Sequence, residues 1–232
     1  MTRLKLIRAP LKYVQGKGAL LNFYEEIKDL GSSFLFICSK SGYRSCHKKI
    51  EKSFEGTECK LHFKIFNGIS SNGEIEKMRK IVKEEQIEVV VGIGGGSALD
   101  TAKATAYYEK LPVAIIPSIT ATDAPCTGLS VIYHDDGAFD TYLFYPKNPE
   151  AVIVDSQIIA DAPVKFLIAG MGDALGTYFE ARACMRTNSP SLENGGISLS
   201  AMALCELCYK TLLKCGYQAK LSCEKHLVTP AL

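Results

Sequence analysis

Short apolar runs alternate with helical patterns along the first 155 residues of the chain. Runs without polar positions, such as residues 89–91, are typical of parallel strands buried on both faces, whereas apolar residues three and four apart predict helices. The expected strands are residues 10–14, 34–37, 61–66, 89–93, 112–117 and 151–155. The expected helices are residues 18–30, residues 41–54, and segments beginning at Asn72 and near Ser97. This alternation predicts an α/β fold with a doubly wound parallel sheet of the Rossmann-like type.

Two further strands, residues 129–133 and 139–144, flank an Asp-Gly pair at 136–137, which predicts a β-hairpin. After residue 161 the strand patterns stop. Helical patterns follow at 163–169, 173–186 and about 196–214, separated by polar and glycine-rich breaks. We therefore expect an α/β domain at 1–161 and a partial all-helical domain at 162–232, which is short for an independent domain.

A glycine-rich segment joins the strand at 89–93 to the following helix. Its glycines are Gly92, Gly94, Gly95 and Gly96. Ser97, with Asp100 three residues later, resembles the capping box that starts a helix. Glycines let the backbone approach a ligand closely, and a helix N-terminus offers free N–H groups to a phosphate. The spacing matches only the first two glycines of G-x-G-x-x-G, so a turn without a ligand remains the alternative to the predicted phosphate site.

A second loop, residues 118–128, follows the strand at 112–117 and is rich in hydroxyl side chains. Its single acid is Asp123. In parallel α/β sheets, ligands bind beyond the carboxyl ends of the strands. Both loops are therefore expected to face a ligand, although a hydroxyl-rich loop of this kind is also common as a solvated surface loop.

The composition is that of an ordinary globular protein, with 47% hydrophobic and 22% charged residues. The net charge of +2 and the lack of a Lys/Arg run argue against a nucleic-acid partner. No apolar run approaches the roughly 20 residues that span a bilayer, and the first residues lead into no signal-peptide core. We expect a cytoplasmic protein without a membrane partner.

The chain has nine cysteines, and the odd count together with the absent signal sequence predicts reduced thiols. Cys205 and Cys208 form a C-x-x-C pair, followed by Cys215 and Cys223. These four thiols would suit a zinc knot. Their place inside a helical pattern favours small core-facing residues instead, because zinc knuckles normally lie in loops.

Five segments, matched in order and spacing, resemble the iron-containing (group III) alcohol dehydrogenase family. The segments are residues 92–103, beginning Gly-Ile-Gly-Gly-Gly-Ser, residues 117–126, residues 129–133, residues 148–149 and residues 169–175. The resemblance extends from about residue 9 to the chain end. It implies an α/β dinucleotide domain, an all-helical domain and a site in the cleft between them. It also implies oxidation of glycerol to dihydroxyacetone, with hydride passing to NAD and a divalent metal, zinc in this branch, holding the alcohol oxygen. We further expect a homo-oligomer.

The resemblance also assigns roles to individual residues. The residues that it implies for the dinucleotide are Ser39, Gly94, Gly95, Gly96, Ser97, Ala98, Leu99, Asp100, Ser118, Ile119, Thr120, Ala121, Thr127, Leu129 and Tyr133. Asp123 is implied to contact the polyol, and Asp173 is implied to be the first metal ligand. These roles suit the chemistry, since amides bind phosphate, a carboxylate binds hydroxyls and a hard oxygen binds a divalent ion.

The chain departs from the family pattern in two places. Ser39, followed by Lys40, stands where the family commonly carries an acid for the adenosine ribose, so NADP is less strongly disfavoured although NAD stays the expected cofactor. The family's two metal-binding histidines lie in segments beyond Leu232. None of the four histidines in this chain forms a helical pair that could replace them; they are His47, His62, His134 and His226.

Three functional hypotheses follow. The first is a polyol dehydrogenase that is truncated or a fragment, which binds NAD weakly and turns over poorly by itself. The second is a nucleotide-binding module without catalysis. The third is a related enzyme acting on a phosphorylated polyol such as glycerol 1-phosphate, which the carboxylate of Asp123 disfavours.

Overall fold

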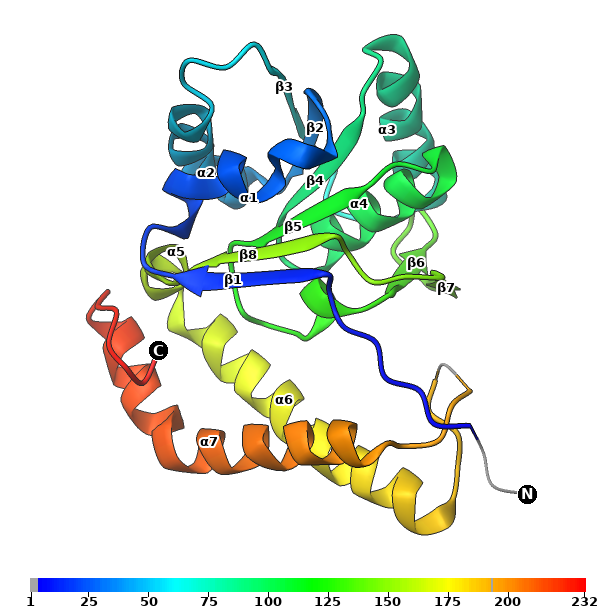
Figure 1. The fold of residues 1–232 in the computed structure, drawn as a ribbon, viewed down its shortest axis with the longest axis vertical. Coiled ribbons are helices and arrows are strands. Elements are labelled where there is room, and N and C mark those ends of the chain that lie inside the picture. The colour runs from blue at the N-terminus through cyan, green and yellow to red at the C-terminus, as the bar shows by residue number, and fades with distance from the viewer. Residues whose placement is uncertain (1–3, 193) are drawn as a thin grey trace.

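The structure is a computed structural model that describes residues 4–192 and 194–232. Its centre is a six-stranded sheet in the order β1-β8-β5-β4-β2-β3, and every adjacent pair is parallel (Figure 1). The strands are β1 (Lys12–Gly16), β2 (Ser33–Cys38), β3 (Lys60–Ile65), β4 (Val89–Gly94), β5 (Val113–Pro117) and β8 (Ala151–Asp155). All six predicted sheet strands are confirmed, with bounds that differ by at most two residues.

Helices cover both faces of this sheet, which confirms the doubly wound fold. One group comprises η1 (Ala19–Asn22), α1 (Phe23–Ile27), η2 (Lys28–Leu30) and α2 (Lys40–Ser53), and the other comprises α3 (Asn72–Glu84) and α4 (Gly96–Glu109). Alternation along β2 explains the arrangement, because successive side chains of a strand point to opposite faces. Phe34 and Phe36 join the core beneath α1 and α2, whereas Leu35 and Ile37 join the core beneath α3 and α4.

The hairpin predicted from the Asp-Gly pair is present. Strands β6 (Leu129–Tyr133) and β7 (Phe139–Phe144) form an antiparallel pair outside the main sheet, preceded by η3 (Ala124–Cys126). Ile132 anchors the hairpin, since it packs with Ile75 of α3 and Ala104 of α4 in a small third core. The hairpin, which follows the loop after β5, therefore packs against α3 and α4.

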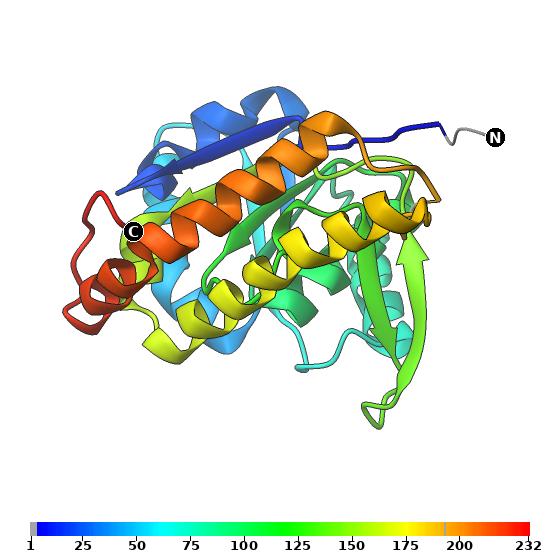
Figure 2. The same cartoon turned by 90° about the horizontal axis from the view of Figure 1, so that it is seen from below.

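The helical part consists of α5 (Ser156–Asp161), α6 (Val164–Thr187) and α7 (Leu199–Glu224). The two long helices pack against each other on one side of the α/β part (Figure 2). Residues 4–6 run alongside, where the Leu6 amide donates to the Gly196 carbonyl at 3.3 Å. No helix in the described ranges 4–192 and 194–232 is long and apolar enough to cross a membrane.

Three helix predictions were wrong in extent. The helix predicted at about 196–214 is α7, which begins at Leu199 and continues to Glu224. The helix predicted at 18–30 is three short pieces, η1, α1 and η2, because Leu20, Phe23 and Ile27 all reach one core and the backbone tightens on either side of α1. The separate helices predicted at 163–169 and 173–186 are one helix, α6. The glycines between them cost only about 1 kcal/mol each in a helix interior, which packing outweighs.

Candidate functional site

The carboxyl ends of three neighbouring strands bring the predicted loops together. Ser39, directly after β2, donates its amide to the Ile93 carbonyl of β4 at 2.9 Å. Ser118, directly after β5, donates its amide to the Gly94 carbonyl at 2.9 Å. The structure therefore places Ser39 and Ser118 on either side of the segment 94–96, here called the glycine turn. In parallel sheets this edge is where ligands bind.

The glycine turn leads directly into α4. Gly95 is the N-cap, without a side-chain cap, and Ser97 lies inside the first turn, so the predicted capping box is wrong. Gly94 has a φ of +153°, and a Cβ placed on it would lie 2.8 Å from the Ala98 Cβ. Glycine at this position lets the helix begin tightly against β4. The first amides of a helix have no intrahelical acceptor, so Gly96 and Ser97 offer donors to an anion.

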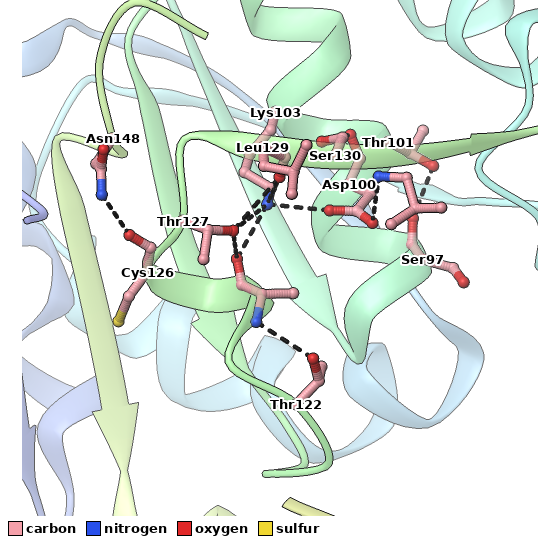
Figure 3. Close-up of polar contacts among 12 residues, drawn as sticks. Ser97, Asp100, Thr101, Lys103, Thr122, Cys126, Thr127, Leu129, Ser130 and Asn148 are labelled. Carbon is pink, nitrogen blue, oxygen red and sulfur yellow. Dashed lines mark hydrogen bonds and ion pairs between the residues drawn. The ribbon is translucent and has the colours of Figure 1, made fainter. Parts of the chain in front are cut away.

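The carboxylate of Asp100 does not face the glycine turn. Asp100 is 5% exposed, and its Oδ1 lies 3.0 Å from the Nζ of Lys103, which is 2% exposed. The amide of Val131 donates to the other carboxylate oxygen at 3.1 Å. Burial lowers the pKa of the Lys103 ammonium, and the charge of Asp100 partly offsets this effect. The assignment of Asp100 to the dinucleotide stays a prediction, and its side chain contacts Lys103 and the backbone of β6 (Figure 3).

Lys103 also binds the segment that follows Asp123, a role that the sequence did not predict. Its ammonium donates to the Ala124 carbonyl at 2.9 Å, to the Leu129 carbonyl and, at 3.4 Å, to the Thr127 hydroxyl (Figure 3). Thr127 and Leu129 are thus held beside α4. A lysine three residues after an acid in an alanine-rich helix was the available signal, but it suggested only an ion pair within the helix.

Tyr133 lies farther along β6 than the other assigned residues. Its amide donates to the Ser70 carbonyl at 2.9 Å, just before α3 begins. The structure therefore brings Ser118 into backbone contact with the glycine turn and Ser39 into backbone contact with Ile93 just before it. It attaches Thr127 and Leu129 to α4 and places Tyr133 at the end of the hairpin strand.

The helical part approaches the loop after β5 most tightly at Gly170. A Cβ placed on Gly170 of α6 would lie 1.9 Å from the Thr120 carbonyl oxygen and 2.8 Å from its carbonyl carbon. Only a residue without a side chain allows this approach. The Thr120 hydroxyl is buried and has no hydrogen-bond partner within the described part of the chain. The loop therefore packs closely against α6 and contains a buried hydroxyl without a hydrogen-bond partner.

One helical turn beyond Gly170, Asp173 meets the predicted substrate residue. The Asp123 amide donates to Asp173 Oδ2 at 3.0 Å. Partial burial raises the pKa of the Asp123 carboxyl, and the negative charge of Asp173 raises it further, while Lys103 acts in the opposite direction. The family resemblance implied a site in the cleft between the two domains, with Asp123 at the polyol and Asp173 at the metal, and the structure brings these two residues into contact.

Two cavities flank this contact. One, of about 280 Å³, lies between the loop and the two long helices, where its lining includes Thr120, Asp123, Gly170 and Met171. The other, of about 270 Å³, lies between the loop and strands β1 and β8. Leu232 lines both cavities. Asp123 therefore stands at the rim of two adjoining hollows, each large enough for a small molecule.

The described residues do not assemble a complete metal centre. Over residues 4–192 and 194–232, no group of three or more His, Cys, Asp or Glu side chains is placed to hold a metal. The alternative zinc knot is wrong, because all four of its cysteines are free thiols spread along the single helix α7. His226 lies just past α7, with its Nδ1 3.2 Å from the Ala160 carbonyl oxygen.

Comparison with known proteins places this geometry in a family. Residues 10–156 match the sequence profile described as iron-containing alcohol dehydrogenase. The glycerol dehydrogenase of Escherichia coli O6:H1 is 46% identical over 98% of this chain and 62% of the relative. The glycerol dehydrogenase of Thermotoga maritima is 48% identical over 96% of this chain and 61% of the relative.

Solved structures agree with these sequence relatives. The crystal structure of glycerol dehydrogenase from Schizosaccharomyces pombe superposes with a TM-score of 0.92 at 35% identity, covering 99% of this chain and 58% of that one. A probable glycerol dehydrogenase from Sinorhizobium meliloti superposes with a TM-score of 0.90 at 32% identity, covering 98% of this chain and 62% of that one. The chain spans about 62% of the length of the curated relatives that it matches.

Proposed function

The chain belongs to the iron-containing alcohol dehydrogenase family, and from this premise we propose that it carries the dinucleotide-binding part of a polyol dehydrogenase. The proposed reaction is the oxidation of glycerol to dihydroxyacetone, in which a carbon-bound hydride passes to NAD and the hydroxyl proton is released. The observation that carries the proposal is the 3.0 Å contact between the Asp123 amide and Asp173 beside the glycine-turn edge of the sheet. We assign the α/β domain to 1–161 and the start of the helical domain to 162–232.

The residues present fit a dinucleotide. The amides of Gly96 and Ser97 at the start of α4 suit a diphosphate, because helix N-termini attract anions. We assign the ribose of the adenosine half to Ser39. The loop that includes Ser118 and Thr120 follows the neighbouring strand, and the buried, unpartnered Thr120 hydroxyl is available to a bound ligand. The assigned residues Ile119, Ala121, Thr127, Leu129 and Tyr133 remain part of this proposal.

Asp123 is the proposed polyol contact. A carboxylate accepts hydrogen bonds from two neighbouring hydroxyl groups, and such charge-assisted bonds are stronger than neutral ones. A phosphorylated polyol would place a second negative charge against Asp123 and Asp173, which disfavours the glycerol 1-phosphate alternative. The two acids therefore support a neutral polyol as the substrate.

The metal is the part of the proposal that the described residues fit least well. We assign Asp173 as a ligand of a divalent metal, specifically zinc. A catalytic zinc ion has three protein ligands, and a bound ion would polarise the alcohol oxygen. The part of the chain that the structure describes offers only Asp173, with Asp123 beside it, so the ligand set does not fit a complete centre. We derive no step through the metal.

The incomplete ligand set favours a second candidate function. A chain with an intact dinucleotide site and one metal ligand would retain NAD without oxidising glycerol. The two candidates share the binding step and differ in turnover. Adding NAD, zinc and glycerol to the chain and following NADH absorbance separates them. A rate of roughly 1 s⁻¹, the low edge of typical turnover, would support the enzyme and exclude the binding module.

Binding itself is tested by titrating NADH into the purified chain and following its fluorescence. Gly96→Asp places a negative charge at the proposed diphosphate site, where a Cβ meets only Thr122 Cγ2 at 3.5 Å, an ordinary contact. The matched control is Gly16→Asp at the end of β1, where a Cβ meets no atom within 4 Å. We expect saturable binding that Gly96→Asp weakens at least about tenfold and Gly16→Asp leaves unchanged. Binding that both variants retain, or no binding by the parent, overturns the proposed function.

A further inference from the structure

Lys103 is a buried cation surrounded by oxygen acceptors. It lies seven residues after Gly96 on α4, about 10 Å along the helix axis. An ammonium has three N–H donors. Four acceptors surround these donors: the Asp100 carboxylate, the Ala124 and Leu129 carbonyls and the Thr127 hydroxyl. Lys103 is therefore fully engaged inside the protein.

Apart from Asp100, the acceptors of Lys103 belong to one short loop, with a carbonyl at each of its ends. The carbonyl of Ala124 stands directly after Asp123, and the carbonyl of Leu129 begins β6. Thr127, between them, donates its hydroxyl to the Ala124 carbonyl at 3.2 Å. The Lys103 ammonium thus bonds both ends of the loop 124–129 and fixes the position of this loop along α4 (Figure 3).

The partner of Lys103 extends this attachment into the hairpin. The Asp100 carboxylate accepts from the Val131 amide at 3.1 Å, and the Ser130 hydroxyl donates to the Asp100 carbonyl at 3.1 Å. A buried lysine is costly unless it is paired and hydrogen-bonded. Removing its ammonium leaves the buried Asp100 carboxylate without its counter-ion and takes a donor away from the Ala124 and Leu129 carbonyls, so the loop has a physical reason to shift.

These contacts link the two ends of the proposed dinucleotide site. The glycine turn, at the start of α4, would hold the diphosphate, and the loop after Asp123 would face the reacting end, because Asp123 is the proposed polyol contact. We propose that Lys103 is a positioning residue that fixes the distance between the diphosphate-binding turn and the loop at the reacting end. This inference rests on the proposed function and deepens it.

The test compares Lys103→Met with Lys49→Met. Lys49 of α2 also forms an ion pair with a buried aspartate, at 3.2 Å from Asp155. Both variants should melt at a lower temperature than the parent. Each is titrated with NADH and with ADP-ribose, which carries the diphosphate but lacks the nicotinamide, at a temperature where circular dichroism shows it folded.

We expect Lys103→Met to raise the Kd for NADH at least about tenfold and the Kd for ADP-ribose less than about threefold. Lys49→Met should change neither. Lys103→Arg should recover most of the NADH affinity, because Lys103 also borders a cavity of about 270 Å³ that leaves room for a larger cation. If Lys103→Met does not fold, the double variant Asp100→Asn, Lys103→Met removes both buried charges and is measured in its place.

The outcomes separate the inference from the proposed function. A parent that binds neither NADH nor ADP-ribose overturns both. A parent that binds both, with a Lys103→Met variant that binds NADH equally well, overturns the inference alone. Equal weakening of NADH and ADP-ribose also overturns it, since that result indicates a general loss of structure. Weakening of NADH alone supports it.

Discussion

The α/β part and the helical part of this chain differ in how they bury their apolar side chains. Every residue of β2, β4, β5 and β8 is buried, and the side chains on both faces of the sheet are covered by helices. On α6, by contrast, the one buried residue is Ala181. On α7, Leu199 is 75% exposed and Leu207 is 62% exposed. The first part has a core of its own, and the second has an apolar surface.

This difference in burial bears on the candidate site, because the α/β part forms one side of the site and the helical part forms the other. The glycine turn and the loop after β5 are fixed by buried strands, whereas Asp173 is carried by a helix whose apolar residues, apart from Ala181, are half-buried or exposed. The rigid side is the one that we assign to the dinucleotide. Four measurements test whether the two parts, which differ in burial, also differ in how much their side chains contribute to stability and association.

The largest effect is expected from truncating the sheet core. Phe36 is fully buried and stacks on Phe63 with ring centroids 4.5 Å apart, so Phe36→Ala should lower the free energy of unfolding by about 3–5 kcal/mol. The matched change in the helical part, Leu207→Ala, should alter it by no more than about 0.5 kcal/mol. Urea unfolding followed by circular dichroism measures both. Equal losses would erase the distinction between the two parts.

The next effect concerns the contact between the parts. Gly170→Ala places a methyl group against the Thr120 carbonyl and should destabilise the protein by about 1–3 kcal/mol. Gly172→Ala, two residues later in the same helix, meets no atom within 4 Å and should stabilise it by up to about 1 kcal/mol. Thermal melting distinguishes the two. A neutral Gly170→Ala would mean that α6 does not rest on this loop in solution.

A smaller effect is expected in association. The helical pattern after residue 162 predicts exposed apolar faces that include Leu199, Leu207 and Leu212; the structure confirms the first two, while Leu212 is half-buried and Leu213 is 67% exposed. Exposed apolar patches favour association, so the purified chain should self-associate. Leu207→Glu combined with Leu213→Glu should shift it toward monomer in sedimentation experiments. A monomeric parent would contradict this expectation of a homo-oligomer.

The smallest effect depends on pH. The pKa of Asp123 is raised in the folded chain, so its charged form opposes folding at neutral pH and this cost disappears as pH falls through the raised pKa. Asp123→Asn should therefore raise the melting temperature slightly at pH 7. The parent and variant should converge near pH 3, where the parent carboxyl is protonated in both states. If the variant were less stable than the parent at pH 7, the charged Asp123 carboxylate would stabilise the fold, contrary to this prediction.

The sequence predicted the sheet well because burial on both faces leaves a visible record. Residues 89–91 and 113–116 contain no polar position, and such runs have few alternatives to a central parallel strand. The Asp-Gly pair likewise predicted the hairpin from local backbone preferences. The loops at the carboxyl ends of β2, β4 and β5 follow from topology, so the order of strands and helices is enough to group Ser39, the glycine turn and Ser118 at one edge of the sheet.

The missed features all depend on contacts between distant residues. Gly170 looked like a helix break, and only its approach to Thr120 explains why α6 continues through it. Asp100 looked like a capping residue, although its partners are Val131 and Lys103. The backbone carbonyls that accept from Lys103 lie more than 20 residues away in the sequence. Local propensity carries no information about such partners, so these residues could be placed only by the fold.

The position of β1 at the edge of the sheet has a consequence during synthesis. Its neighbour is β8, and Lys12 pairs with Ala151, so β1 has no partner strand until the residues between them have been synthesised. At translation speeds of about 5–20 residues per second, the interval is on the order of ten seconds. During this interval β1 has no neighbouring strand, and its backbone N–H and C=O groups are accessible to chaperones.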